Sequence, residues 1–263
     1  MKIVANDLIG KFNLKFFGNI NHEITDLGTL TKTGETFISW AKNAKVLKTK
    51  LNGVIVCSEE NFKKIKPLNS VTYLLTNENP RLIFAKILHL YFSSKIIDDF
   101  TNHVLYHKKN SNIKIGENVF FGKNVLIGNN TLIHHNVTIN SNTIIGENCI
   151  LRANSSIGTE GLGLVYDPMK KSYFKFPQIG GVIIKDQVEI GPSSTIRRSA
   201  LDNTTIGKGT KIGSLCNIGH NCEIGTNCII TSNVIMSGSS TIGNNVFMGI
   251  GSTVKQGINI GNS

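Results

Sequence analysis

Tryptophan, proline and long hydrophobic runs are scarce in this chain of 263 residues, which contains one tryptophan and five prolines. No stretch approaches the roughly 20 consecutive apolar residues that a membrane-spanning helix needs. The first ten residues contain one lysine, then alternate polar and apolar side chains, and lack the apolar core of a secretory signal peptide. We therefore expect a globular cytoplasmic protein without a transmembrane segment.

Cysteine is scarce as well, and its spacing needs an explanation. The five cysteines are Cys57, Cys149, Cys216, Cys222 and Cys228, and the last three are spaced by six residues. Their odd number and the missing export signal predict free thiols rather than disulfide bonds. The regular spacing could indicate metal ligands, unless a repeat explains it.

Acidic residues are outnumbered, with 17 Asp and Glu against 28 Lys and Arg, and the formal net charge is +11. A solvated, lysine-rich surface is one explanation of this charge, and an anionic partner is the other. The lysines are scattered, and no recognition helix or RNA-binding signature accompanies them. Phosphate-bearing small molecules or carriers are therefore favoured over nucleic acid.

A hexapeptide repeat dominates the chain from residue 113 onward. One large apolar residue recurs at every sixth position, a compact residue stands two positions before it, and glycine often follows it. A helix requires a period of 3.6 and a half-buried strand a period of two, so neither explains a period of six. The twenty-one apolar positions are Ile115, Phe121, Ile127, Ile133, Ile139, Ile145, Leu151, Ile157, Ile184, Ile190, Ile196, Ile206, Ile212, Ile218, Ile224, Ile230, Met236, Ile242, Met248, Val254 and Ile260.

Hexads of this kind are typical of a parallel β-helix. Three hexads form one triangular coil, so residues eighteen apart stack and the repeat predicts about seven coils. Gly and Asn take the corners, where φ can be positive. We predict a mainly β protein, with a left-handed parallel β-helix over residues 111–263. A small α/β domain over residues 1–110 precedes it, with strands at 35–40, 52–57 and 71–75 and helices at 59–66 and 80–107.

The repeat also explains the cysteines. Cys149, Cys216, Cys222 and Cys228 all fall at the compact inward position of their hexads, and neighbours six apart lie on different faces of the prism. Core packing is therefore favoured over metal binding. No metal site is predicted, because the three histidines of a γ-type carbonic anhydrase must converge on zinc. Here His134 and His135 lie several coils from His220, so the histidines cannot converge within one chain.

Two breaks interrupt the repeat. Residues 159–181 form an excursion rich in glycine and proline, and residues 197–205 insert four extra positions between two hexads. Loops that leave a rigid scaffold often carry function, although a tolerated insertion is the alternative.

Seven motifs, in their order and spacing, resemble the LpxD family, the UDP-3-O-acylglucosamine N-acyltransferases of lipid A synthesis. They are residues 38–43 (ISWAKN), 79–88 (NPRLIFAKIL), 158–163 (GTEGLG), 177–181 (PQIGG), 200–204 (ALDNT), 217–221 (NIGHN) and 234–239 (VIMSGS). The resemblance implies a homotrimer with active sites between neighbouring coils. It implies His220 as the general base, the Gly238 N–H as the oxyanion donor and Asn217 beside the histidine. It further implies that Trp40 stacks on the nucleotide base and that Asn43 bonds to its edge.

The residues themselves support part of this assignment. His220 follows the inward Ile218 in a turn, so its imidazole should point outward, and a histidine is suited to accept a proton as an amine attacks a thioester. A nucleophilic pair of His220 with Cys216 or Cys222 is the weaker alternative, since both thiols belong to the predicted core. Gly238 could be a plain corner glycine, and Trp40 could belong to the core. The other six histidines have no comparable context.

Several departures from the family affect the predicted substrate. The chain ends at Ser263 within the repeat, without the family's C-terminal helices that engage acyl carrier protein. Residues 257–258 replace a second histidine, Val46 replaces a tyrosine of the uracil site, and Arg197, Arg198 and Ser199 replace Asp-Arg-Gly. Arg197 and Arg198 could pair with phosphates, or could simply line a solvated loop.

We therefore predict an N-acyltransferase without a bound cofactor. Its thioester co-substrate would be acyl-CoA, and its acceptor the amine of a UDP- or dTDP-linked amino sugar for cell-surface polysaccharide such as O-antigen. The alternative is true LpxD activity, from 3-hydroxyacyl carrier protein to UDP-3-O-acylglucosamine. A non-catalytic β-helix binding module is a more distant third.

Overall fold

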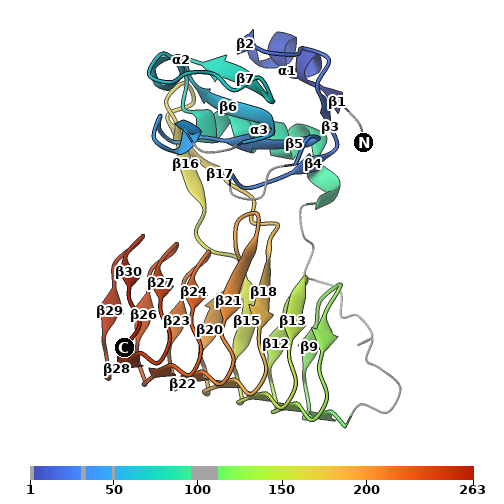
Figure 1. The fold of residues 1–263 in the computed structure, drawn as a ribbon. Helices are drawn as coiled ribbons and strands as arrows, with labels where there is room; N and C mark the ends of the chain where they lie inside the picture. Colours follow the sequence, from blue (N-terminus) through green and yellow to red (C-terminus); the bar gives the residue numbers. More distant parts are fainter. Residues whose placement is uncertain (1–2, 31–33, 49–50, 96–111) are drawn as a thin grey trace. The chain divides into compact units, whose positions relative to one another are not determined.

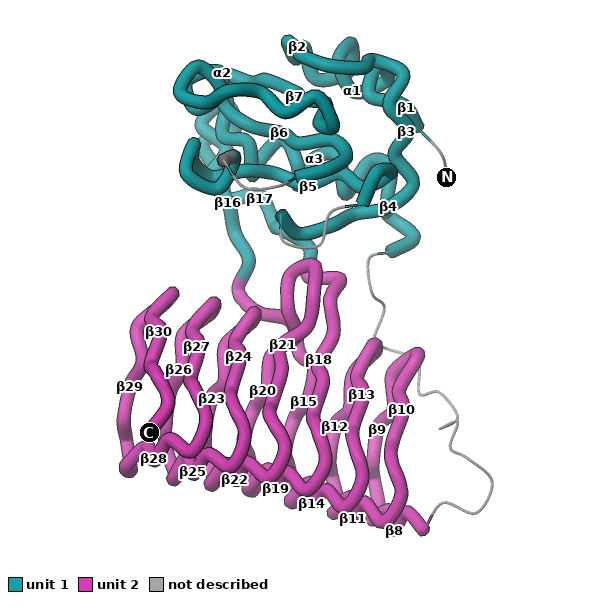
Figure 2. The backbone as a smooth tube through the Cα atoms, in the orientation of Figure 1, with its two compact units in different colours: residues 1–96, 163–177 teal, residues 97–162, 178–263 magenta. Residues whose placement is uncertain are grey.

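The computed structural model describes residues 3–30, 34–48, 51–95 and 112–263. The chain divides into two compact units (Figure 2). The N-terminal unit comprises Met1–Ile96 together with Gly163–Pro177, and the second unit comprises Ile97–Leu162 and Gln178–Ser263. The domain boundary expected at residue 110 lies outside the described residues. Most of the predicted excursion groups with the N-terminal unit rather than with the repeat.

Three parallel sheets of seven strands each form the second unit, which is the predicted β-helix (Figure 1). The first sheet contains β10 (Leu126–Ile127), β13 (Thr143–Ile145), β18 (Gly181–Ile184), β21 (Asn203–Ile206), β24 (Glu223–Ile224), β27 (Thr241–Ile242) and β30 (Asn259–Ile260). The second contains β8 (Lys114–Ile115), β11 (Leu132–Ile133), β14 (Ile150–Leu151), β19 (Glu189–Ile190), β22 (Lys211–Ile212), β25 (Ile229–Ile230) and β28 (Phe247–Met248). The third contains β9 (Phe120–Phe121), β12 (Thr138–Ile139), β15 (Ser156–Thr159), β20 (Thr195–Arg197), β23 (Asn217–Ile218), β26 (Ile235–Met236) and β29 (Thr253–Val254).

The core of the β-helix is the stack of large apolar hexad residues. Ile127 lies in register with Ile145, which in turn lies in register with Ile184, and all three are buried. Most of the compact residues two positions earlier are buried too, including the four cysteines of the repeat, which have free thiols. The predicted hexad core and the predicted thiol packing are therefore confirmed.

Asparagine and glycine are required at the corners of the β-helix for different reasons. The hexad asparagines Asn118, Asn124, Asn130, Asn136, Asn142, Asn148, Asn154, Asn221, Asn227, Asn233 and Asn245 all have a positive φ, a conformation that asparagine tolerates better than most residues. The glycine after the large apolar residue is needed for space instead. A methyl group on Gly128 would stand 2.6 Å from the carbonyl carbon of Gly146 in the next coil. The expectation of positive φ thus holds for the asparagines and for Gly209, Gly251 and Gly257 at the same corner position. The glycines that directly follow the large apolar residue instead allow neighbouring coils to approach closely.

The N-terminal unit contains a five-stranded sheet in the order β2-β7-β6-β5-β4. Its strands are β2 (Lys15–Phe17), β4 (Asp26–Leu27), β5 (Phe37–Trp40), β6 (Gly53–Ser58) and β7 (Val71–Thr76). β4 to β7 run parallel, and β2 is antiparallel to β7. The central strands β6 and β7 are almost wholly buried, which explains their continuous apolar sequence. A separate pair, β1 (Ile3–Val4) and β3 (Glu23–Ile24), flanks α1 (Ala5–Phe12).

Helices are shorter than the sequence pattern predicts. α2 spans only Glu59–Phe62, and α3 spans Pro80–Tyr91, capped by the Asn79 side chain on the Arg81 N–H at 3.0 Å. Short 3-10 turns lie at Val46–Lys48, before α2, and at Ser93–Lys95, after α3. Residues 96–107 of the predicted helix lie outside the described residues. Within the described ranges, no helix combines the length and the apolar character required to cross a membrane.

A hairpin from the excursion, β16 (Leu164–Asp167) and β17 (Ser172–Lys175), packs on α3 within this unit. The ring of Phe84 stacks on that of Phe176 at 6.0 Å, and the Arg81 guanidinium lies 4.9 Å from the centre of the Phe176 ring. Lys86 places its ammonium 3.3 Å from the buried carboxylate of Asp167. The hairpin is therefore a structural part of the N-terminal unit.

Candidate active site

One edge of the β-helix carries both breaks in the repeat. The excursion connects β15 of the third sheet to β18 of the first, and the second insertion connects β20 to β21 in the same way. The turns that contain His220 and Gly238 connect β23 to β24 and β26 to β27, again from the third sheet to the first. Four successive coils therefore meet along a single corner of the prism.

Backbone hydrogen bonds join the two insertions at this corner. The Ile179 N–H donates to the Ala200 carbonyl and the Gly181 N–H donates to the Asp202 carbonyl, each at 2.9 Å. The next coil holds the second insertion through Asn221, whose side-chain amide donates to the Ser199 hydroxyl at 2.7 Å. The excursion, the insertion and the turn of His220 thus form one continuous layered structure.

Asn221 also determines which nitrogen of His220 carries the proton. Its Oδ1 accepts the Ala200 N–H at 3.2 Å, which identifies this end of the amide as the oxygen. The same oxygen lies 2.8 Å from Nδ1 of His220. Because an oxygen acceptor requires a donor, Nδ1 carries the proton and Nε2 of the neutral imidazole has a free lone pair. The orientation of the ring and the tautomer of its neutral form therefore suit His220 to act as a base through Nε2.

Two glycines enclose the imidazole of His220, which is half-buried in its turn and lies outside the apolar core. A methyl group on Gly238 would stand 2.7 Å from both Cε1 and Nε2 of the ring. A methyl group on Gly161, from the excursion, would stand 2.7 Å from Cδ2. Only residues without a side chain leave room for the ring in this position.

The Gly238 N–H has no hydrogen-bond partner among the described residues. At the same point of other turns, a side chain eighteen residues further on accepts this N–H, as Asn244 does for Thr226 at 2.8 Å. The residue eighteen positions beyond Gly238 is the exposed Gln256, which makes no such bond. A free backbone donor therefore lies beside the free lone pair of His220.

Asn217 and Arg197 lie together next to this corner, in the neighbouring strands β23 and β20. Nε of Arg197 donates to Oδ1 of Asn217 at 3.3 Å, and both side chains are half-buried. Asn217 precedes the turn of His220 as the sequence places it. Phosphate binding by Arg197 stays a prediction.

Arg198, the second arginine of this insertion, is placed in the interior of the protein, and phosphate binding by it stays a prediction. Its side chain is completely buried, and Nε donates to the carbonyl oxygen of Gly158, while its backbone N–H donates to Thr159. The guanidinium is thus directed to the polypeptide at the start of the excursion. An arginine that the sequence places in a loop thus forms buried hydrogen bonds between the second insertion and the start of the excursion.

The thiols near His220 are unsuited to act as nucleophiles. Cys216 and Cys222 are buried at 2% and 0% exposure, and Sγ of Cys222 donates to the Ser237 carbonyl at 3.3 Å. Burial raises the pKa of both thiols above the ordinary value. They remain protonated near neutral pH, which argues against a Cys–His nucleophile.

Trp40 and Asn43 belong to the N-terminal unit, at the carboxyl end of β5. Trp40 is half-buried, and Asn43 is exposed and accepts the Val46 N–H at 3.3 Å. Ligands of open parallel sheets bind outside the carboxyl ends of the strands. The position suits nucleotide binding, which stays a prediction for both residues.

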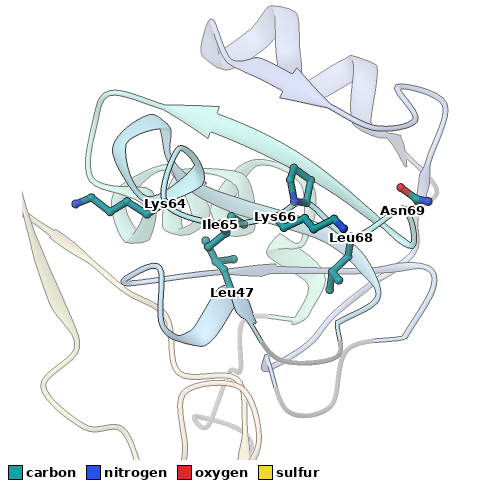
Figure 3. A pocket seen from close by; sticks show the side chains of 7 residues that line it. Leu47, Lys64, Ile65, Lys66, Leu68 and Asn69 are labelled. Atoms are coloured by element: carbon teal, nitrogen blue, oxygen red, sulfur yellow. The ribbon is translucent and has the colours of Figure 1, made fainter.

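A hollow of about 700 Å³ in the same unit lies elsewhere (Figure 3). It is lined by Leu47, Lys64, Ile65, Lys66, Pro67, Leu68 and Asn69, which belong to segments that precede β6 and β7. Neither Trp40 nor Asn43 lines it. Within the described part of the chain, no cluster of three or more His, Cys, Asp or Glu residues could hold a metal ion.

Sequence reasoning missed Gly161, Ser199 and Asn221 as parts of the corner. A signal was available, because both breaks and both turns follow hexads of the same sheet when the hexads are counted in threes. The breaks therefore had to emerge at the corner of His220. Which residues touch there depends on loop conformation, which the repeat does not encode.

Two family models match the repeat. The bacterial transferase hexapeptide (six repeats) matches residues 124–159 and 203–238, and the hexapeptide repeat of succinyl-transferase matches residues 240–263. Among solved structures, UDP-N-acetylglucosamine O-acyltransferase (LpxA) from Moraxella catarrhalis RH4 is similar, with a TM-score of 0.51 and 26% identity over 60% of each chain. The predicted fold class, a left-handed parallel β-helix with a small α/β unit, is confirmed.

Two curated relatives with the same activity name match parts of the chain. UDP-3-O-acylglucosamine N-acyltransferase of Coxiella burnetii (strain Dugway 5J108-111) is 54% identical over 55 residues, or 21% of this chain and 16% of that protein. The enzyme of the same name from Geobacter sp. (strain M21) is 40% identical over 88 residues, 34% of this chain and 25% of that protein. The chain thus matches no more than a quarter of the length of these two relatives. The matches confirm the resemblance to LpxD-like hexapeptide acyltransferases.

Proposed function

We propose that this hexapeptide-repeat chain is a cytoplasmic N-acyltransferase that acts on UDP-3-O-acylglucosamine. One observation supports this most directly: Asn221 accepts a hydrogen bond from Nδ1 of His220, which leaves Nε2 of the neutral imidazole as an acceptor beside the free N–H of Gly238. A base and an oxyanion donor side by side are what acyl transfer to an amine requires. The names of the curated relatives support the choice of acceptor.

The reaction needs no acyl-enzyme, because a thioester is already activated. The sugar amine attacks the thioester carbon while Nε2 of His220 accepts an amine proton, and the Gly238 N–H donates to the carbonyl oxygen as it becomes negative. As the C–S bond breaks, the protonated imidazole returns its proton to the departing thiolate. An amide and a free thiol result, and His220 regains its initial state.

The acyl donor in this proposal is an acyl carrier protein that holds a 3-hydroxyacyl chain. Acyl-CoA is the competing donor. A homotrimer remains part of the proposal, with each site at a seam between neighbouring chains. Phe247 and Ile229 of the second sheet, 67% and 49% exposed in a single chain, offer apolar surface for such assembly.

The decisive assay offers purified protein both donors and several acceptors. Mass spectrometry would follow N-acylation of UDP-3-O-acylglucosamine and of UDP- and dTDP-amino sugars, with carrier-linked or CoA-linked acyl chains. We expect turnover of UDP-3-O-acylglucosamine with the carrier-linked chain and a particle of trimeric mass. Release of free CoA with a different amino sugar nucleotide would replace this proposal by the short-chain alternative.

Trp40 provides a test of nucleotide recognition. If its indole stacks on uracil, Trp40→Ala should weaken binding of UDP-3-O-acylglucosamine by about 10-fold, since base stacking on an aromatic ring is worth about 1–3 kcal/mol. Isothermal titration calorimetry measures the dissociation constant, with Tyr91→Ala as a control aromatic deletion elsewhere in the same unit. An unchanged dissociation constant for Trp40→Ala would remove this residue from the site.

A further inference from the structure

Gln178 is a buried amide at the corner of His220 that the proposed mechanism does not use. It lies where the excursion returns to the β-helix, three residues before β18, and only 1% of it is exposed. Its Oε1 accepts the Gly161 N–H at 2.9 Å. Because a backbone N–H is always a donor, this bond fixes which end of the amide is oxygen and which is nitrogen.

Nε2 of Gln178 is therefore a donor, and no acceptor among the described residues forms a hydrogen bond with it. The atom is also buried. An unpaired buried donor destabilises a folded protein, so such groups are few in native structures. A donor retained in this state at the edge of a candidate active site points to a ligand that completes it.

Gly161 relates this donor to the imidazole. A methyl group on Gly161 would stand 2.8 Å from Oε1 of Gln178 and 2.7 Å from Cδ2 of His220. Gln178 thus lies near the Cδ2 edge of the ring, whereas Gly238 lies at the Cε1 and Nε2 edge. If the amine lies at Nε2 and the acyl carbonyl at Gly238, as in the proposed function, the acceptor sugar would extend toward Gly161 and Gln178.

We propose that Nε2 of Gln178 binds an uncharged oxygen of the acceptor sugar, a hydroxyl or ester oxygen adjacent to the reacting amine. An amide N–H is a neutral donor, which suits a hydroxyl or ester better than a phosphate. Its anchored oxygen fixes the direction of the donor, so that the bond also orients the amine toward His220. This assignment rests on the proposed function.

Two substitutions distinguish the role of the Nε2 donor of Gln178 from that of its Oε1 atom, which accepts the Gly161 N–H. Gln178→Glu keeps an oxygen for the Gly161 N–H and, assayed at about pH 8, replaces the donor by a carboxylate oxygen. Gln178→Met removes both groups at similar volume. The control is Gln187→Glu, the same exchange at an exposed position between β18 and β19, at another corner. Steady-state kinetics would use UDP-3-O-acylglucosamine and a 3-hydroxyacyl carrier protein.

We expect both Gln178 variants to raise KM for the sugar nucleotide about 10-fold, the size of one lost hydrogen bond, with KM for the acyl carrier protein unchanged. Gln187→Glu should match the wild type. If Gln178→Glu behaves as wild type, or if the change falls on the acyl donor instead, sugar binding by Nε2 is wrong. If Gln178→Met does not fold, as its melting curve would show, Gln178→Glu alone decides. Absence of wild-type turnover would overturn the proposed function, and this assignment with it.

Discussion

His220→Ala should lower kcat by about 10²–10⁴, the usual contribution of general base catalysis. The substitution removes the only imidazole at the corner where Gly161 and Gly238 meet among the described residues. It should leave the fold intact, because the ring lies outside the apolar core and Ile218 continues to fill the interior. Steady-state kinetics and a melting curve measure both effects.

His135→Ala is the matched control. His135 stands two positions after Ile133, just as His220 stands two positions after Ile218, but it belongs to a corner between the second and third sheets. Its Nδ1 accepts the Glu117 N–H at 2.8 Å. Loss of this histidine should leave kcat unchanged. Near-wild-type turnover of His220→Ala, with the control also active, would remove His220 from the mechanism.

Gly238→Ala should reduce kcat by about 10²-fold, although the variant retains the backbone N–H and the His220 side chain. The added methyl would stand 2.7 Å from Nε2, so the imidazole must leave the position in which it meets the amine. A misplacement of about 1 Å at a reacting group can cost this much. Backbone strain is not the cause, because Gly238 does not have a positive φ.

The control for this substitution is Gly249→Ala, in the following coil. A methyl there has nothing closer than Ser252 Oγ at 4.0 Å, and Gly249 also lacks a positive φ. Kinetics and size-exclusion chromatography on both variants separate a local displacement from a loss of assembly. Full activity in Gly238→Ala would show that the ring need not occupy this place during catalysis.

The N-terminal unit was less predictable than the repeat. β5, β6 and β7 were found because buried parallel strands carry continuous apolar runs. α1 and the two-residue strands β1, β3 and β4 give no comparable pattern, since they are too short for a period to emerge. The helix predicted over 80–107 ends as α3 at Tyr91, where Ser93 and Ser94 favour turns over helix.

The two arginines of the second insertion also show how little the sequence predicts about the burial of a single side chain. Arg197 and Arg198 are equivalent in sequence, yet Arg197 is half-buried beside Asn217 and Arg198 is completely buried against Gly158. Sequence position cannot distinguish them, because the difference depends on a carbonyl forty residues away along the chain. The excursion supplies that carbonyl only after the coils have stacked.

The hexads by themselves determined the β-helix, its number of coils, the inward thiols and the edge from which both insertions emerge. They could do so because each hexad makes the same local choice of apolar core residue and tight corner, and stacking repeats it. Only the tertiary structure decided what surrounds His220. Hydrogen bonds of Asn221 with Ala200 and His220 determine the tautomer of the imidazole. Gly161 and Gly238 leave the space that the ring occupies. Gln178 adds a buried side-chain N–H donor without a partner among the described residues. These contacts join segments from separate coils, so they exist only when the prism has closed around its core.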